Sequence, residues 1–158
     1  MWVYVSQCCS TAMDWYSRYV ISWEISNSLE ADFCILALLR ALKKGRPEIF
    51  NTDQGSQFTS SEYTGTLESS DILVSMDGKG ISLDNIFIER LWRTLKYEDI
   101  YKRSYETPQE LYEGLNSYFS FYNRRRLHQA LSYSCPEEVW LKSLTQNRAS
   151  AIIAGGQK

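Results

Sequence analysis

The spacing of hydrophobic and polar positions changes along the 158-residue chain, from short apolar runs to helical periods and back. Residues 12–26 are rich in aromatic and β-branched side chains, which favour strands, and residues 14–18 predict a turn between two of them. Residues 29–44 carry apolar positions at helical spacing and a cationic end closed by Gly45. The chain is therefore predicted to begin with a hairpin or meander followed by a helix.

Two further short apolar runs predict buried strands. The first covers residues 48–53 and ends at an Asp, and the second covers residues 72–76. Between them, either serine at residues 60–61 can cap a helix that continues to about residue 69. Strands alternating with helices indicate an α/β fold, and a mixed sheet is expected because the first two strands form a hairpin.

The second half of the chain is predicted to be mainly helical. Residues 77–82 contain two glycines and no periodicity, so we expect a mobile loop there. Asp84 is placed to cap a long helix over residues 85–103, and Thr107 is placed to cap the helix after it. A short last helix is expected to begin at Pro136.

Composition is that of an ordinary globular domain, with 44% hydrophobic, 23% charged and 14% aromatic residues. No apolar run is long enough to cross a membrane, and the first ten residues do not form a secretion signal. We expect a soluble cytoplasmic protein with no membrane partner. The four cysteines lack CxxC spacing and are expected to be reduced and mostly buried, not zinc ligands.

Charge is distributed unevenly, although the formal net charge is only -2. Residues 1–89 carry 6 basic and 12 acidic side chains, whereas residues 90–158 carry 11 basic and 7 acidic ones. An acidic half joined to a basic half can place carboxylates beside a surface that binds a polyanion. Two solvated surfaces of unrelated sign would give the same counts, so charge alone leaves both interpretations open.

The predicted helix over residues 85–103 has one chemically distinctive face. Glu89 shares it with three other side chains, because steps of four and seven residues return to within about 40 degrees; these are Asn85, Arg93 and Lys96. The adjacent apolar stripe consists of Ile88, Leu91, Trp92 and Leu95. The helix is predicted to pack this stripe and to expose a carboxylate flanked by cations. An ordinary solvated face with i, i+4 ion pairs is the alternative.

Three longer strings give these residues a context. NTDQGSQFTS, SMDGKGISLDNIFIERLWRTLKYE and YETPQELYEGLNSYFSFYNRRRLHQALSYSCPEEVW resemble the catalytic core of bacterial insertion-sequence transposases, members of the DDE superfamily related to retroviral integrases. The resemblance is strongest over residues 12–141. It implies an α/β, ribonuclease H-like mixed sheet flanked by helices, with the first strand incomplete or missing. The implied organisation is a catalytic core over residues 1–145 and a flexible tail over residues 146–158.

The resemblance also implies a chemistry. Asp53 and Glu89 match the family's second Asp and its Glu, with 35 residues between them, and Lys96 matches a basic position seven residues beyond the Glu. The family uses such carboxylates to hold Mg²⁺ or Mn²⁺, hard cations that prefer oxygen ligands. Two ions can stabilise the attacking and leaving oxygens of an in-line displacement at a phosphodiester. The implied function is a transposase or integrase core that cleaves DNA and transfers strands during integration and transposition.

The match departs from the family at its start. The family's first catalytic Asp lies on the first core strand, upstream of the position matched by Asp14. We therefore expect an N-terminally truncated core without this ligand, and Asp14, in a turn, is a poor substitute. Two carboxylates should hold the cation weakly, so the catalytic function is expected to be defective in this chain. The alternative is a non-catalytic remnant that binds DNA or assembles with transposase subunits, and the assignment as an enzyme stays open.

Further residues receive roles through the same resemblance. DNA contacts are implied for Lys79, Arg93, Lys96, Arg124, Arg125 and Arg126, and a structural motif for Asp84, Asn85, Tyr122, Asn123 and His128. Lys79 is alternatively an ordinary loop lysine, and Arg93 and Lys96 alternatively pair with neighbouring carboxylates. His128 is expected to order a turn, with a role as catalytic base less favoured. The expected partners are DNA and either further copies of the chain or full-length transposase subunits in a bacterial cytoplasm.

Overall fold

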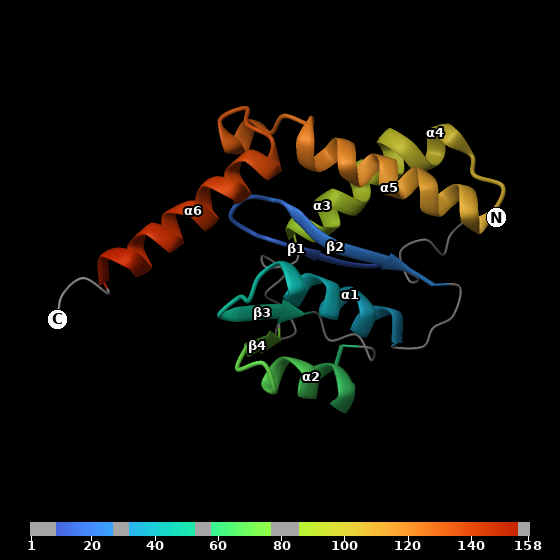
Figure 1. Cartoon of the computed structure of the whole chain (residues 1–158). Helices are drawn as coiled ribbons and strands as arrows, with labels where there is room; N and C mark the ends of the chain where they lie inside the picture. The colour runs from blue at the N-terminus through green and yellow to red at the C-terminus, as the bar shows by residue number, and fades with distance from the viewer. Residues whose placement is uncertain (1–8, 27–31, 53–57, 77–85, 155–158) are drawn as a thin grey trace. The chain divides into compact units, whose positions relative to one another are not determined.

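The computed structural model describes residues 9–26, 32–52, 58–76 and 86–154, with side chains described except at residues 9, 76 and 147–154 (Figure 1). The chain divides into two compact units. Unit 1 consists of Met1–Met13 and Ile21–Ser104, and unit 2 consists of Asp14–Val20 and Tyr105–Lys158. Each unit is described by itself.

The described strands form two small sheets. One contains β1 (Cys9–Met13) and β2 (Val20–Ile25), whose first residue is counted with unit 2. The other contains β3 (Ile49–Thr52) and β4 (Leu73–Met76), which run parallel. Parallel neighbours need a crossover connection, and α2 (Ser61–Glu68) supplies it. The predicted hairpin and both predicted later strands are therefore confirmed.

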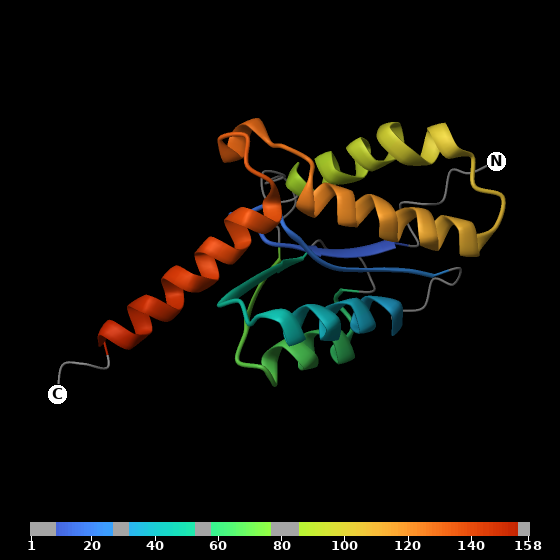
Figure 2. The same cartoon turned by 45° about the horizontal axis from the view of Figure 1, so that its top comes forward.

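The core of unit 1 lies between its first two helices. From α1 (Asp32–Lys44), Phe33, Cys34 and Leu38 pack with Tyr63 and Leu67 of α2. Figure 2 shows the two helices running alongside one another. Because these apolar positions recur at helical spacing, each helix buries one stripe and leaves the opposite side to solvent.

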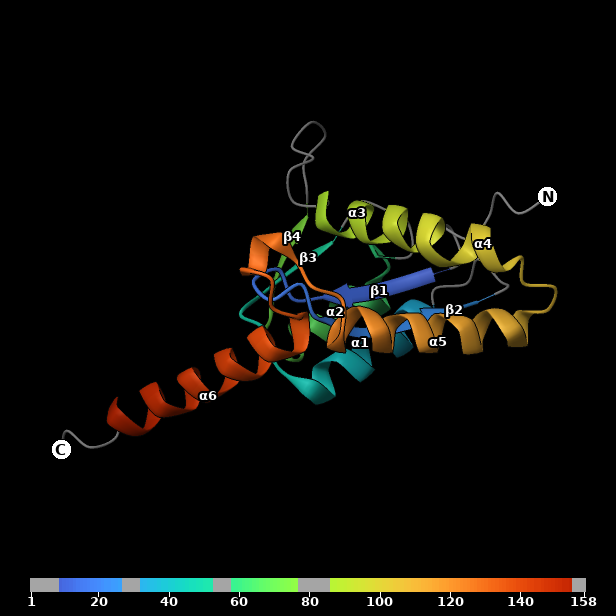
Figure 3. The ribbon, with the colours of Figure 1, turned by 90° about the horizontal axis from the view of Figure 1, so that it is seen from above.

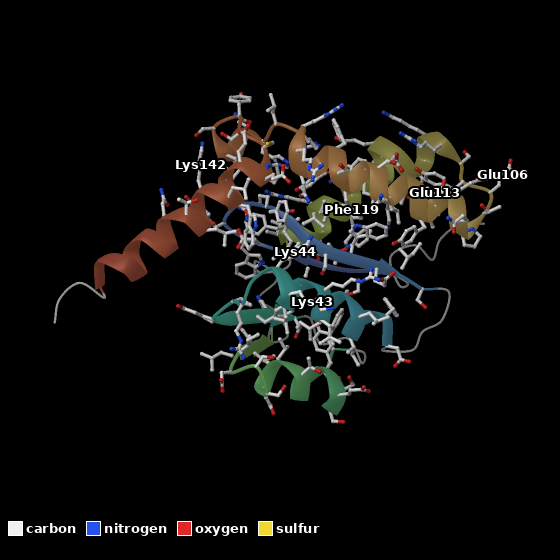
Figure 4. All side chains as sticks on the ribbon, viewed as in Figure 1. Lys43, Lys44, Glu106, Glu113, Phe119 and Lys142 are labelled. Carbon is white, nitrogen blue, oxygen red and sulfur yellow. The ribbon has the colours of Figure 1, made fainter. Side chains whose placement is uncertain are left out.

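Polar contacts attach α1 to β2. The Lys44 ammonium donates a hydrogen bond to the backbone oxygen of Ile21 (2.6 Å), and the Ser22 hydroxyl donates one to the oxygen of Ala37 (2.7 Å). Lys43 and Lys44 form the cationic end of α1 that the sequence predicted (Figure 4). Cations at this end are favourable because helix carbonyls leave partial negative charge there.

The last helical segment of unit 1 is one continuous rod (Figure 3). It begins as α3 (Ile86–Leu95), widens into the π-helical turn η1 (Lys96–Ile100) and ends as α4 (Tyr101–Arg103). Ser104, with a φ of 50°, terminates it in the left-handed conformation. The predicted long helix is confirmed in its extent, whereas the π turn was not predicted.

Unit 2 contains the turn that leads into β2 and three helical segments, α5 (Pro108–Arg124), η2 (Gln129–Leu131) and α6 (Pro136–Ala154). The Thr107 hydroxyl accepts a hydrogen bond from the Glu110 backbone N–H, and Pro108 follows at the first helical position, as predicted. In Figure 4, Phe119 marks the buried stripe of α5, which also includes Leu115 and Tyr118.

The last helix differs from the prediction. Pro136 begins it as expected, but α6 continues for 19 residues instead of ending after a few. Its sequence lacks a clear apolar stripe, so its length could not be predicted from periodicity. The flexible tail over residues 146–158 stays a prediction. Among the described helices, none is both long and apolar enough to span a bilayer.

Candidate metal and nucleic-acid site

Glu89 lies in the first turns of α3, on the side opposite the residues that anchor the helix. Leu91 and Leu95 are fully buried, as the predicted apolar stripe requires. Glu89 is exposed, and its carboxylate makes no hydrogen bond or ion pair with any residue that the structure describes. A helix held by one buried stripe thus presents a carboxylate that can accept an external ligand.

Four cations on the same helical rod are also without ion-pair partners among the described residues. They are Arg90, Arg93, Lys96 and Lys102, of which only Lys96 is partly buried. The alternative in which Arg93 and Lys96 neutralise Glu89 is not seen within the described part of the chain. Unpaired cations in high dielectric cost little, and they leave positive charge available for an anion.

Several predicted site residues fall outside the part of the chain that the structure describes. These are Asp53, Lys79, Asp84 and Asn85. Thr52, the last described residue of β3, is buried and pairs in register with Met76. The predicted approach of the Asp53 and Glu89 carboxylates to within about 8 Å, as joint ligands of one cation, stays a prediction.

Asp14 is already engaged within its own turn. One carboxylate oxygen accepts hydrogen bonds from the Ser17 backbone N–H (2.8 Å) and the Ser17 hydroxyl (2.5 Å). The Asp14 N–H in turn donates to the Tyr19 oxygen (2.9 Å), which closes the turn. The Asp14 carboxylate therefore has a structural role, because it stabilises this turn of unit 2.

The donor chemistry of the candidate ligands fits a hard divalent cation. Glu89 offers an exposed carboxylate, and carboxylate oxygens are the preferred protein ligands of Mg²⁺ and Mn²⁺. In the ranges that the structure describes, no group of three His, Cys, Asp or Glu side chains comes close enough to hold a metal. Glu89 by itself would supply one carboxylate ligand, and the coordination shell of the cation requires further oxygen ligands.

The π turn after α3 contains a buried acidic residue. Asp99 is only 2% exposed, and its carboxylate forms an ion pair with the Arg103 guanidinium at 2.8 Å. The turn is marked by the Tyr101 N–H, which donates to the oxygen of Lys96 five residues earlier. A π turn inserts one extra residue into a helix and so rotates everything beyond it.

In unit 2, the Asn123 side chain of α5 binds the backbone of Val20, which follows the turn. Its amide oxygen accepts from the Val20 N–H (2.9 Å), and its amide nitrogen donates to the Val20 oxygen (3.0 Å). Val20 is 3% exposed and Asn123 is 9% exposed, so Asn123 supplies hydrogen-bond partners to two backbone groups that are buried from water. This pairing reproduces what a neighbouring strand would provide.

The segment after α5 is held by backbone contacts of His128. Its N–H donates to Ser134 (3.2 Å), and its oxygen accepts from Leu131 (3.0 Å) and Tyr133 (2.9 Å). The imidazole packs edge-on against the Tyr122 ring, with centroids 5.0 Å apart. These contacts are those of a residue that orders a turn.

The three consecutive arginines lie in different surroundings. Arg124 forms an ion pair with Glu137 at 3.1 Å, and the Arg126 guanidinium lies 5.9 Å from the centre of the Tyr122 ring. Arg125 is exposed and has no ion-pair partner among the described residues. Of this cluster, Arg125 has the charge most available to a phosphate.

Tyr19 has a perturbed ionisation that sequence reasoning missed. Its ring stacks on Trp140 with centroids 5.5 Å apart. Burial raises the pKa of Tyr19 above its ordinary value, and Glu137 adds to this while Arg124 opposes it. No local pattern marks this residue, because its environment comes from a helix more than a hundred residues away in the sequence.

Comparisons of the amino-acid sequence with known proteins identify relatives of this chain. Residues 2–82 match a family model described as Integrase core domain, and residues 70–136 match a second model of the same description. The transposase for insertion sequence element IS904 of Lactococcus lactis subsp. lactis (strain IL1403) is 35% identical over 130 residues, 80% of this chain and 51% of the relative. Transposase InsF for insertion sequence IS3A of Escherichia coli (strain K12) is 31% identical over 147 residues, 90% of this chain and 50% of the relative. The chain thus spans about half the length of these curated relatives.

Solved structures share the fold at low sequence identity. The HTLV-2 integrase catalytic core domain in complex with magnesium, in its trimeric form, matches with a TM-score of 0.65 and 22% identity, covering 84% of this chain and 83% of that one. A chain of the simian T-cell lymphotropic virus intasome in complex with PP2A regulatory subunit B56 gamma matches with a TM-score of 0.63 and 21% identity, covering 76% of this chain and 43% of that one. The predicted ribonuclease H-like α/β fold is confirmed.

Proposed function

Because the chain belongs to the integrase core domain family, we propose that it acts on DNA as the core of an insertion-sequence transposase. The substrate class is a phosphodiester of DNA, and the reaction class is metal-dependent cleavage followed by strand transfer. Support comes from the named activity of the curated relatives, which this chain matches over 80% to 90% of its length.

The observation that carries this proposal is the exposed face of the α3 rod. Glu89 has no partner among the described residues, and Arg93 and Lys96 beside it are equally uncommitted. Phosphate oxygens need cations, and a divalent metal needs carboxylates. A face that offers both within two helical turns suits a metal-bound phosphodiester better than it suits an uncharged ligand.

The proposed division of roles follows from side-chain chemistry. Asp53 and Glu89 would hold Mg²⁺ or Mn²⁺, which when bound stabilises negative charge on the oxygens of the displacement. Arg93 and Lys96 would bind neighbouring phosphates and fix the strand in register. Phosphate contacts are also proposed for Lys79, Arg124, Arg125 and Arg126, with Arg125 the least committed of the described three.

A second candidate, DNA binding without cleavage, is favoured by one observation. One carboxylate oxygen of Asp14 accepts two hydrogen bonds from Ser17 within its own turn, which disfavours Asp14 as a metal ligand. A third carboxylate for the metal would therefore have to come from elsewhere. We expect the 158-residue chain by itself to bind magnesium weakly and to bind DNA without producing Glu89-dependent cleavage.

A nicking and strand-transfer assay with Mn²⁺ separates the two candidates. The variants are Glu89→Gln and, as a matched control, Glu98→Gln, an exposed carboxylate nine residues further along the same rod. A product that disappears in Glu89→Gln and persists in Glu98→Gln would establish the chain as an enzyme. DNA binding with no such product would support the second candidate, and absence of DNA binding would contradict both.

A further inference from the structure

Two tyrosines form an exposed aromatic pair on the rod that carries Glu89. Tyr97 and Tyr101 are 62% and 60% exposed, although each has a large apolar ring. Their ring centroids are 5.5 Å apart with an interplanar angle of 83°. In this edge-to-face arrangement the two rings support each other and still leave ring faces open to a ligand.

The π turn brings this pair toward the face of Glu89. Tyr101 follows Glu89 by twelve residues, which in an unbroken α-helix leaves it rotated by about 120 degrees. The extra residue of the π turn between Lys96 and Ile100 removes about 100 degrees of this rotation. Tyr101 therefore returns to within about 20 degrees of Glu89, with the Tyr97 ring against it.

Charge decides which kind of ligand suits the pair. Arg93 and Lys96 lie on the N-terminal side of the tyrosines and Lys102 on the C-terminal side, none of them in an ion pair with a described residue. Of the two acidic residues in this turn, Asp99 is buried and paired with Arg103, whereas Glu98 is exposed, so the three cations outnumber the one exposed carboxylate of the turn. Aromatic faces interleaved with free cations fit a strand that presents bases and phosphates alternately. A second copy of this face would instead bring like charges together.

We propose that Tyr97 and Tyr101 form a stacking site for unpaired bases of a DNA strand. This deepens the proposed function and rests on it. Unpaired bases are required because the bases of an intact duplex already stack on each other and keep their faces covered. The site would hold a single-stranded or frayed segment beside the Glu89 carboxylate, with Arg93 and Lys96 on its phosphates.

The test compares two single DNA strands of equal length, an oligodeoxyadenylate and an abasic strand with the same number of phosphates. The wild-type chain should bind the oligodeoxyadenylate at least about fivefold more tightly for each stacked base. Tyr97→Ala with Tyr101→Ala should abolish this preference, whereas Tyr97→Phe with Tyr101→Phe should retain it. The dependence of binding on salt should stay unchanged in both variants, because no charge is removed.

Tyr133→Ala is the matched control, since Tyr133 is 66% exposed and lies in unit 2. It should bind both strands as the wild type does. Equal binding of the two strands by the wild type, or a base preference that survives in the double alanine variant, would overturn the stacking site and leave the proposed function intact. Absence of binding to any DNA would overturn both.

Discussion

At the scale of single residues, unit 2 depends on side chains that complete the hydrogen bonds of the backbone. Asn123 is the clearest case, because its one amide satisfies both the N–H and the oxygen of Val20. A buried backbone group left without a partner costs on the order of 1–3 kcal/mol. The family motif drew attention to Asn123, but the partner of its side chain lies 103 residues away and could not be predicted locally.

We predict that Asn123→Ala lowers the free energy of unfolding by about 2–4 kcal/mol, since it leaves two buried groups unpaired. Urea unfolding followed by circular dichroism measures the change. Asn116→Ala is the control, because Asn116 is exposed on the same helix and should change stability by less than about 0.5 kcal/mol. Equal stabilities of the two variants would show that the Asn123 contact is dispensable.

Tyr19 leads to a prediction about pH. Its pKa is raised in the folded protein above the ordinary 10.0, chiefly by burial, so the folded state retains the phenolic proton more tightly than the unfolded chain. The associated stability is present below pH 10 and is lost as the pH rises through the folded-state pKa. As the pH rises above 10 through the folded-state pKa, the free energy of unfolding should fall more steeply in the wild type than in Tyr19→Phe. Parallel curves would contradict the perturbed pKa.

At the scale of elements, a glycine inside α5 illustrates how packing overrides propensity. Gly114 is buried, and a methyl group there would overlap the ring of Tyr105. Alanine is favoured over glycine within helices by about 1 kcal/mol, so propensity and packing oppose each other at this position.

We predict that Gly114→Ala destabilises the protein by about 1–3 kcal/mol because the Tyr105 ring must move. In a Tyr105→Ala background, the same substitution should stabilise by about 1 kcal/mol, because only the helix preference remains. A double-mutant cycle with denaturant unfolding measures this coupling. The same sign of effect in both backgrounds would show that the ring does not constrain Gly114.

The elements themselves were largely predictable, and the exceptions have physical reasons. Apolar spacing located the hairpin, β3, β4 and the helices, and Ser60 caps α2 as one of the two expected serines. The π turn was missed because only three helical residues, Tyr101–Arg103, follow it, too few to reveal a shift in the hydrophobic pattern. The aromatic pair Tyr97 and Tyr101 was missed for a related reason, since tyrosines four residues apart are as typical of a packed stripe as of an exposed one.

At the scale of the whole molecule, the candidate site is a local excess of positive charge on a chain that is slightly negative as a whole. The net charge of -2 would disfavour a polyanion, yet the α3 rod presents Arg90, Arg93, Lys96 and Lys102 without ion pairs among the described residues. The predicted excess of basic residues after residue 89 is thus already present within this one helical rod. The family resemblance predicted Glu89, Arg93 and Lys96 as a group, whereas the joint role of Asp53 and Glu89 stays a prediction.

The most direct measurement is the salt dependence of duplex DNA binding by the wild type, by Arg93→Ala with Lys96→Ala, and by Glu98→Gln. Each phosphate contact contributes about 0.9 to the slope of log affinity against log salt. Our account predicts that the double variant binds more weakly at low salt with a slope smaller by about 1–2, while Glu98→Gln leaves the slope unchanged. A wild-type affinity that does not fall with salt, or a double variant with the wild-type slope, would contradict the assignment of this helix face to DNA.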